Sequence, residues 1–286
     1  MQNNLFTESN SNPLMQKIEQ ECSVDISLKM EYPPVALSVG TKLIETNDGQ
    51  ISLPIPIGTY GNFSFVQAPP KTKKTFFISL LSSVYLSGQN NFGGDIKGHR
   101  TNQCLLHIDT EQGQWHAQRV FKRAIDMCDI DGTQCYLTFA LRQIGFKKRI
   151  EFIEYLLKDK IKNTGLVIID GIADLVSDVN NLEESNACIQ KLMEWSAIYD
   201  CHIVTVIHSN FGSDKPTGHL GSFLEKKAET QIQLEANTVN KEWVTVKCKR
   251  SRGYAFDTFS FKVNDLGLPE VIGDLYDPLK NNGKRY

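Results

Sequence analysis

The stretch Asn163–Ile172, NTGLVIIDGI, decides the fold of this chain. Its apolar run ends in Asp170, and a short, fully apolar run is typical of a buried strand in a parallel sheet. Open α/β sheets bind their ligands outside the carboxyl ends of the strands. The stretch therefore predicts a buried parallel strand that carries a carboxylate at a ligand-binding edge.

A second segment upstream, VQAPPKTKKTFF, contains Lys74 followed by Thr75. It aligns with the phosphate-loop pattern G-x-x-x-x-G-K-[ST], but both glycines are replaced, the second by Lys73. In the complete pattern, backbone N–H groups wrap the phosphates, the lysine reaches the outer phosphates and the hydroxyl holds Mg²⁺. Lys74 and Thr75 keep these two side-chain functions between a predicted strand, Phe63–Val66, and a predicted helix, Phe76–Leu86.

Lys73 occupies a position where glycine would adopt a conformation that costs a residue with a Cβ on the order of 1 kcal/mol. A second lysine beside a triphosphate would add favourable charge. A basic surface turn that begins a helix is the alternative interpretation. The residues predicted to bind nucleotide are Pro70, Lys71, Thr72, Lys73, Lys74 and Thr75.

Composition narrows the class of protein. With 286 residues, of which 41% are hydrophobic, the chain can bury one large α/β core with a small appendage. The net charge of -2 excludes a generally basic nucleic-acid coat but leaves room for local basic patches. No apolar run approaches the ~18 residues that span a bilayer, and no signal-peptide core is present, so we expect a soluble cytoplasmic protein without a membrane partner.

The seven cysteines lack the paired spacing of metal ligands, and several fall in apolar segments. Reduced, buried thiols in a cytosolic protein are the simplest account of them. They are Cys22, Cys104, Cys128, Cys135, Cys188, Cys201 and Cys248.

Three regions are expected along the chain. Residues 1–31 read as a polar N-terminal arm with a short helix within Leu14–Met30. Residues 32–60 read as a β-hairpin extension, because Asn47-Asp48-Gly49 separates alternating apolar segments. Residues 61–286 read as an ATPase core that ends in extra C-terminal strands.

Strands and helices alternate after Gly61, which predicts a mainly parallel sheet flanked by helices. Helical patterns lie near 114–128, 147–161 and 183–199. Predicted parallel strands are Phe63–Val66, Cys104–Ile108, Tyr136–Phe139, Leu166–Ile169 and Ile203–Ile207. Predicted extra strands are Thr230–Leu234, Trp243–Lys247 and Thr258–Val263.

A third signal is Leu105–Glu111, LLHIDTE, a strand that ends in Asp109 and Glu111. An acid just beyond a strand beside the phosphate loop can orient and deprotonate the water that attacks the γ-phosphate. The alternative is an acid favoured by the dipole at a helix N-terminus. We favour Glu111 as the catalytic base, with Asp109 as the next candidate.

The order of KKT, IDTE, VIIDGI, VIHSN and GHLGSFLEKKAE resembles the RecA-like P-loop ATPases of the RepA and DnaB helicase branch, over roughly Tyr32–Val271. The resemblance implies a RecA-like α/β fold that uses ATP and Mg²⁺. It assigns the catalytic base to Glu111, the ordering of Mg²⁺ and its water to Asp170, and the sensing of the γ-phosphate to His208. Thr75 and Asp170 would be the Mg²⁺ residues.

The resemblance also implies where DNA and neighbouring subunits bind. The loop Asn210–His219 corresponds to the DNA-binding loop that faces the channel of RecA-like rings, with Lys215 and Thr217 as candidate contacts. Its glycines and lysine suit backbone-led contact with the phosphates of a single strand. An exposed flexible loop is the alternative.

The basic run Val246–Gly253 corresponds to the segment that sends a lysine or arginine into the neighbouring subunit's nucleotide site. Lys249, Arg250 and Arg252 are all candidates, because the spacing departs from the family's K-x-R. A solvated or nucleic-acid-binding cationic patch is the alternative.

The sequence therefore predicts an ATP-hydrolysing motor on single-stranded DNA, a homo-oligomer in the form of a hexameric ring, and a helicase for replication or mobilisation of a mobile element, together with other proteins of that element. Two rival interpretations remain. One is a hydrolysis-impaired nucleotide switch or helicase loader, and the other is a non-enzymatic DNA-binding assembly protein. The missing glycines favour the rivals, whereas Glu111 and His208 favour the enzyme.

Overall fold

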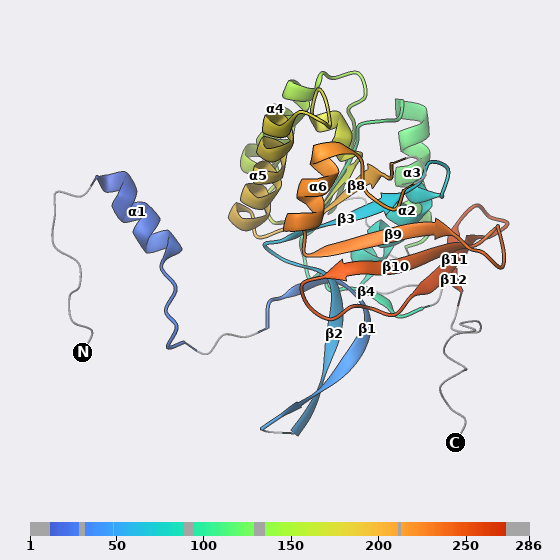
Figure 1. Ribbon diagram of the computed structural model, residues 1–286, viewed down its shortest axis with the longest axis horizontal. Coiled ribbons are helices and arrows are strands. Elements are labelled where there is room, and N and C mark those ends of the chain that lie inside the picture. The colour runs from blue at the N-terminus through green and yellow to red at the C-terminus, as the bar shows by residue number, and fades with distance from the viewer. Residues whose placement is uncertain are drawn as a thin grey trace. The chain divides into compact units, whose positions relative to one another are not determined.

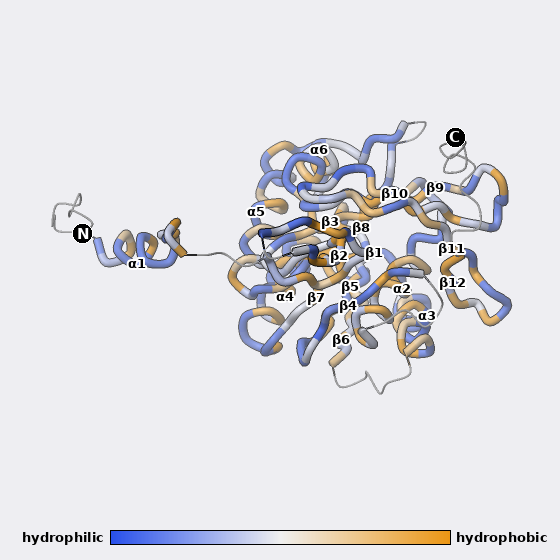
Figure 2. Tube along the Cα trace, turned by 90° about the horizontal axis from the view of Figure 1, so that it is seen from below, coloured by the Kyte–Doolittle hydropathy of each residue, from blue (hydrophilic) through white to orange (hydrophobic). Residues whose placement is uncertain are grey.

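The computed structural model describes residues 12–28, 32–47, 49–88, 94–128, 135–210 and 213–272. The chain divides into two units, Met1–Pro33 and Pro34–Tyr286. The first unit contains the helix α1 (Pro13–Cys22), which begins at Asn12, whose side chain accepts a hydrogen bond from the Leu14 amide over 3.0 Å. Hydrophobic and hydrophilic residues alternate along it (Figure 2).

The helix predicted within Leu14–Met30 ends at Cys22 in the structure. Ser23 is extended, and the Asp25 carboxylate accepts hydrogen bonds from the Ser27 amide and hydroxyl, 2.9 and 2.6 Å away. Short polar side chains that bond to nearby backbone in this way compete with helix formation. Residues 1–11 of the predicted polar arm and residues 29–31 lie outside the described residues.

The second unit is built on a nine-stranded sheet in the order β12-β11-β10-β9-β3-β8-β7-β5-β6. The strands from β9 to β6 in this order pair in parallel, and β10, β11 and β12 are antiparallel. The parallel strands are β3 (Phe63–Ala68), β5 (Cys104–Asp109), β6 (Tyr136–Ala140), β7 (Thr164–Asp170), β8 (His202–His208) and β9 (Thr230–Ala236). The antiparallel strands are β10 (Val244–Ser251), β11 (Phe259–Val263) and β12 (Pro269–Ile272).

Helices cover both faces of this sheet (Figure 1). One hydrophobic core joins the sheet to α2 (Lys74–Ser87) and α3 (Gln114–Asp126). The other joins it to α4 (Phe146–Tyr155), α5 (Leu182–Ile198) and α6 (Gly218–Lys227). Val66 lies in the first core and its neighbour Phe65 in the second, because successive strand residues face opposite sides. This burial on both faces explains why the predicted strands read as continuous apolar runs.

A smaller sheet has the order β2-β1-β4, with β1 (Val35–Thr46), β2 (Gly49–Thr59) and β4 (Ile96–Gly98). β1 and β2 form a hairpin that projects from the body of the second unit (Figure 1). Leu43 is exposed toward the tip, and Lys42 Nζ lies 3.7 Å from the centroid of the Tyr254 ring. Asp48 of the predicted turn lies outside the described residues, whereas its neighbour Gly49 pairs with Thr46.

The main fold prediction is confirmed, since the sheet is mostly parallel, is flanked by helices and ends in antiparallel strands. Two short strands escaped prediction. β4 and β12 have only three and four residues, and each exists through an antiparallel partner, β1 and β11 respectively. None of the seven cysteines forms a disulfide bond, but only Cys188 and Cys201 are buried. The expectation of buried thiols is therefore wrong for Cys22, which is exposed, and for the four partly buried cysteines Cys104, Cys128, Cys135 and Cys248.

Candidate nucleotide site

The polar side chains predicted from separate motifs converge at the carboxyl ends of β3, β5, β7 and β8. Lys74 Nζ lies 2.8 Å from His208 Nδ1, and His208 Nε2 lies 3.3 Å from Glu111 Oε1. An ammonium can only donate, so the neutral imidazole accepts at Nδ1 and carries its proton on Nε2, which faces the carboxylate. His208 therefore joins the lysine to the predicted catalytic base.

The loop between β3 and α2 adopts left-handed turns without glycine. Lys71 has φ 66° and Lys73 has φ 57°, and each such residue carries a cost on the order of 1 kcal/mol. The Thr72 hydroxyl donates to the Pro69 carbonyl over 2.6 Å, which closes the turn. Lys73 begins α2 through its carbonyl, which accepts hydrogen bonds from the amides of the first helical turn. The loop therefore passes through two left-handed residues and leads directly into α2.

The Lys73 side chain turns away from this loop toward the turn between β9 and β10. Its Nζ donates to the Glu242 carbonyl over 2.6 Å. Asn240 stabilises the β9–β10 turn, because its Oδ1 accepts a hydrogen bond from the Glu242 amide over 3.0 Å. The residue that replaces the second glycine therefore links the phosphate loop to the antiparallel part of the sheet.

Negative charge dominates the electrostatics around Lys74. Burial, together with the neighbouring carboxylates of Asp109 and Glu111, raises the pKa of Asp170 to about 7. Burial lowers the pKa of Lys74 against the opposing effect of Glu111 and Asp170. The hydrogen bond from His208 holds the pKa of Glu111 below its ordinary value, with Lys74 contributing less.

The chemistry of the predicted Mg²⁺ residues suits that ion, although no group of three or more His, Cys, Asp or Glu side chains in the described part of the chain is arranged to hold a metal. Carboxylate and hydroxyl oxygens are the ligands that Mg²⁺ prefers, and the charge of the acids near Lys74 exceeds that of the single ammonium. A divalent cation between Thr75 and Asp170 would stabilise the buried Asp170 in its charged form. The donor set is therefore suited to Mg²⁺ and to the phosphates that accompany it.

Two residues of the IDTE segment hold the site in shape. Asp109 is buried and accepts hydrogen bonds from the amides of Glu111 and Gln112, at 3.0 and 2.8 Å, and from the Gln112 side chain at 2.8 Å. The Thr110 hydroxyl accepts from the Gly171 amide over 2.9 Å and so clamps β5 to the end of β7. Sequence reasoning considered Asp109 as a possible base and missed this supporting function, because neither bond follows from a motif.

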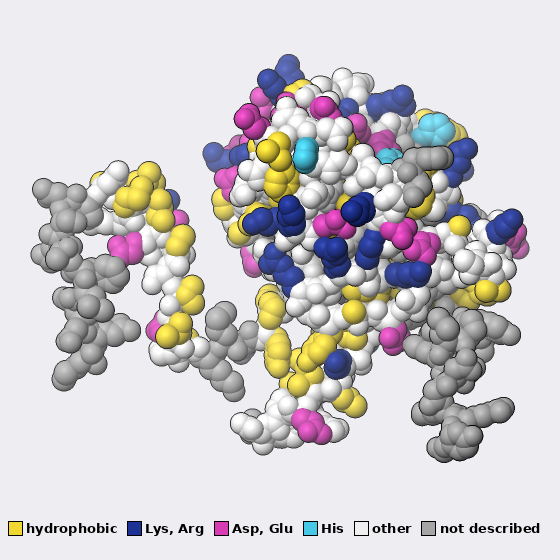
Figure 3. Space-filling model, viewed as in Figure 1, with side chains coloured by type: hydrophobic (Ala, Val, Ile, Leu, Met, Phe, Trp, Pro, Cys, Tyr) yellow, Lys and Arg dark blue, Asp and Glu magenta, His cyan; other side chains and the backbone are white. Residues whose placement is uncertain are grey.

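The candidate trans residues, Lys249 and Arg250 on β10 and Arg252 just after it, differ in what they contact. Lys249 Nζ donates to the Asp214 carbonyl, and Arg252 donates to the Lys227 carbonyl over 2.7 Å. Arg250 is exposed. Figure 3 shows Lys and Arg side chains gathered with some acidic ones over β9, β10 and α6. Arg250 therefore differs from Lys249 and Arg252, whose side chains donate hydrogen bonds to backbone carbonyls of the same chain.

The loop after β8 is closed on itself. Ser209 and Pro216 form an antiparallel bridge, and the Asn210 amide donates to the Lys215 carbonyl over 2.8 Å. Thr217 donates through its hydroxyl to the His208 carbonyl over 2.8 Å, so this candidate DNA contact already serves to cap the loop. Lys215 is exposed. Phe211 and Gly212 lie outside the described residues.

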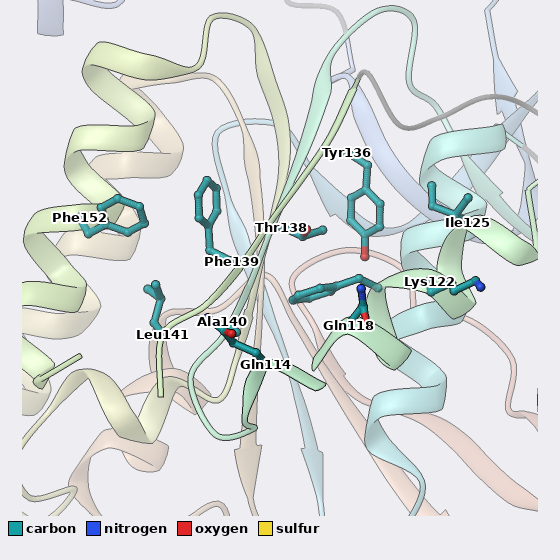
Figure 4. A pocket seen from close by; sticks show the side chains of 11 residues that line it. Gln114, Gln118, Lys122, Ile125, Tyr136, Thr138, Phe139, Ala140, Leu141 and Phe152 are labelled. Carbon is teal, nitrogen blue, oxygen red and sulfur yellow. The ribbon is translucent and has the colours of Figure 1, made fainter. Parts of the chain in front are cut away.

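A cavity of about 650 Å³ lies elsewhere, over the edge strand β6. Its walls come from β6, α3 and α4 and are mainly apolar, with Tyr136, Phe139 and Phe152 among them (Figure 4). None of the predicted catalytic or nucleotide-binding residues lines it.

No helix in the described part of the chain has the length and apolarity needed to cross a membrane.

The parallel sheet, its strand–loop–helix unit and the acids beside Lys74 together define a RecA-like P-loop ATPase fold. Residues 57–214 match the family described as the AAA domain, and the chain belongs to this family. Among solved structures, the crystal structure of the RadB recombinase superposes with a TM-score of 0.54 over 74% of this chain and 91% of that chain. The two sequences are 17% identical, so this likeness concerns the fold alone. No curated protein sequence matches the chain.

Proposed function

We propose that this protein hydrolyses ATP at the carboxyl edge of the sheet. The observation that carries the proposal is the chain of contacts from Lys74 through His208 to Glu111, at 2.8 and 3.3 Å, beside the buried Asp170. These contacts join a phosphate-binding cation, a γ-phosphate sensor and a general base, which phosphoryl transfer needs in one place.

Each residue has a distinct function in this proposal. Lys74 neutralises the outer phosphates, and the amides at the start of α2 favour the same negative charge. Glu111 orients the attacking water and accepts its proton, since its lowered pKa keeps it deprotonated. His208 senses the γ-phosphate in this proposal, because it contacts both the phosphate-binding Lys74 and the base Glu111. Mg²⁺, when held by Thr75 and Asp170, supplies Lewis-acid stabilisation of phosphate charge.

The same proposal extends to DNA and assembly. Lys215 is exposed in the loop that follows β8, the strand that ends at His208. A change in the position of His208 would therefore affect single-stranded DNA bound at this loop. Arg250 is the best candidate for an arginine supplied in trans, because Lys249 and Arg252 hold backbone carbonyls of their own chain. We propose a hexameric ring of the RepA and DnaB helicase type that acts on single-stranded DNA of a mobile element.

A nucleotide switch without turnover is the second candidate. It is favoured by Lys73, because its Cβ occupies the position of the second glycine of the pattern in a left-handed conformation that glycine adopts at no steric cost. Lys73 also contacts Glu242 rather than the loop. In this alternative the protein binds ATP, changes shape and acts as a helicase loader.

Steady-state ATP turnover with and without oligothymidine distinguishes the candidates. Turnover that Lys74→Ala abolishes and that oligothymidine stimulates supports the motor. Tight ATP binding without turnover in the wild-type protein supports the switch. A folded wild-type protein that binds no ATP contradicts both.

A further inference from the structure

Gln67 is the last residue but one of β3, the strand that leads into the phosphate loop. It is fully buried, yet it carries a polar side chain in a strand whose other residues are mostly apolar. Its Nε2 donates to Ser209 Oγ over 3.0 Å and to the Asp214 carbonyl over 2.8 Å. Both acceptors belong to the loop that follows β8.

The orientation of the Gln67 amide is fixed by its other side. Its Oε1 accepts a hydrogen bond of 2.7 Å from Gln231 Nε2 on β9. If the amide were reversed, its oxygen would face the Asp214 carbonyl and its nitrogen would face another donor, so the network admits one orientation. A buried amide with every group paired is costly to disturb, because any unpaired group would lose its hydrogen bond without access to water.

The backbone reinforces this link. The Ser209 amide donates to the Ala68 carbonyl over 3.1 Å, so the last residue of β3 and the first residue after β8 are hydrogen-bonded to each other. Asp214 adjoins Lys215, the candidate DNA contact. A movement of the phosphate loop would therefore reach Lys215 through one buried side chain.

We propose that Gln67 is a positioning residue that couples nucleotide binding to the position of the Ser209–Thr217 loop, and through it to affinity for single-stranded DNA. The inference rests on the proposed ATP and DNA function. It adds the physical connection between the two sites, which no motif in the sequence supplies.

Gln67→Met tests this coupling, because methionine keeps the side-chain volume and removes the donors. Gln233→Met is the matched control, since Gln233 pairs with Gln67 in the sheet register, is also buried and lies on β9. The first measurement is amide hydrogen exchange in the 209–217 loop, with and without a non-hydrolysable ATP analogue and Mg²⁺. The second is the ratio of oligothymidine dissociation constants with and without the same analogue.

We expect the analogue to change exchange at the Asn210 and Thr217 amides in the wild-type protein and in Gln233→Met. The ratio of dissociation constants in both proteins should lie within the roughly 5- to 150-fold range typical of coupled sites. In Gln67→Met we expect analogue affinity to persist, the exchange effect to vanish and the ratio to fall close to one. Gln67→Glu retains an acceptor for Gln231 but loses the donor to Asp214. It replaces Gln67→Met if that variant does not fold, and we expect the same loss of the exchange effect and of the affinity ratio.

A Gln67→Met protein that keeps the wild-type exchange effect and ratio would overturn the coupling. A wild-type protein that binds the analogue without any change at Asn210 or Thr217 would also overturn it and leave ATP binding intact. Failure of the wild-type protein to bind the analogue would instead remove the proposed function, and the coupling with it.

Discussion

His208 Nε2 lies 3.3 Å from Glu111 Oε1, so the candidate sensor and the candidate base are in contact although they are far apart in the sequence. Removing the carboxylate charge of Glu111 should leave ATP binding and the fold intact, because the amide of Glu111→Gln keeps the shape. The rate should fall by about 10²- to 10⁴-fold, the usual effect of removing a general base. Single-turnover hydrolysis measures this loss, and Glu183→Gln is the exposed control. Near-normal turnover in Glu111→Gln would reassign Glu111 to a structural function.

Lys74→Ala should abolish ATP binding or turnover without unfolding the protein, because Lys74 lies at a ligand edge and its burial is incomplete. Lys122→Ala, on the exposed side of α3, should bind ATP like the wild-type protein. Calorimetric titration of ATP and circular dichroism make the comparison. A folded Lys74→Ala protein with unchanged ATP affinity would contradict the assignment of the phosphate loop.

Stability should depend on pH through Asp170. Burial raises its pKa to about 7 from the ordinary value of 3.8, so the folded state keeps a proton that the unfolded state has lost. This difference destabilises the fold progressively as pH rises from 3.8 to about 7, and the penalty is complete above that range. Asp170→Asn should therefore raise the nucleotide-free unfolding temperature at alkaline pH, and the gain should shrink toward acid pH.

Thermal unfolding across this pH range checks the effect, with the exposed Asp265→Asn as the control. If the stability of Asp170→Asn followed the wild-type pH profile, ionisation of the buried Asp170 would cost little folding free energy, which would contradict the raised pKa. The same variant should lose Mg²⁺-dependent turnover.

Arg250→Ala should lower turnover by about 10³-fold or more if Arg250 enters a neighbour's site, as removal of an arginine finger does. Mixing it with Lys74→Ala should restore part of the activity, because one interface then combines an intact phosphate loop with an intact arginine. Turnover per subunit should also rise with protein concentration. A monomer with a concentration-independent rate, and no recovery on mixing, would exclude the ring.

Lys215→Ala should weaken binding to oligothymidine and reduce the slope of log affinity against log salt by about 0.7, the value for one phosphate contact on a single strand. Basal ATP turnover should be unchanged. Fluorescence anisotropy at several salt concentrations gives the slope, and Lys241→Ala in the β9–β10 turn is the control. Equal slopes for wild type and Lys215→Ala would place DNA elsewhere.

The sequence allowed prediction of features that a single segment encodes. Apolar runs gave the buried strands, and an acid or a Lys-Thr pair at their ends gave Lys74, Glu111 and Asp170, because parallel strands bring their carboxyl ends together. Features that require two distant segments were missed. The short β4 depends on β1, and Gln67 is fixed by Ser209, Asp214 and Gln231.

The basic run Val246–Gly253 is a second case in which the sequence alone could not identify contacts between distant segments. Its spacing could not distinguish Lys249, Arg250 and Arg252, because a run of cations carries no information about which carbonyls lie nearby. The contacts of Lys249 with Asp214 and of Arg252 with Lys227 supply that information only after folding. The functions of these residues stay predictions until they are measured.

The left-handed backbone at Lys73 has a consequence for recognising distant relatives. The loop keeps its shape through the Thr72–Pro69 bond and the start of α2 rather than through the conformational freedom of glycine. A search pattern that demands glycine would not find such a chain, although its fold is RecA-like. A pattern written as a buried strand, a turn with positive φ, Lys-Thr and a helix would find it.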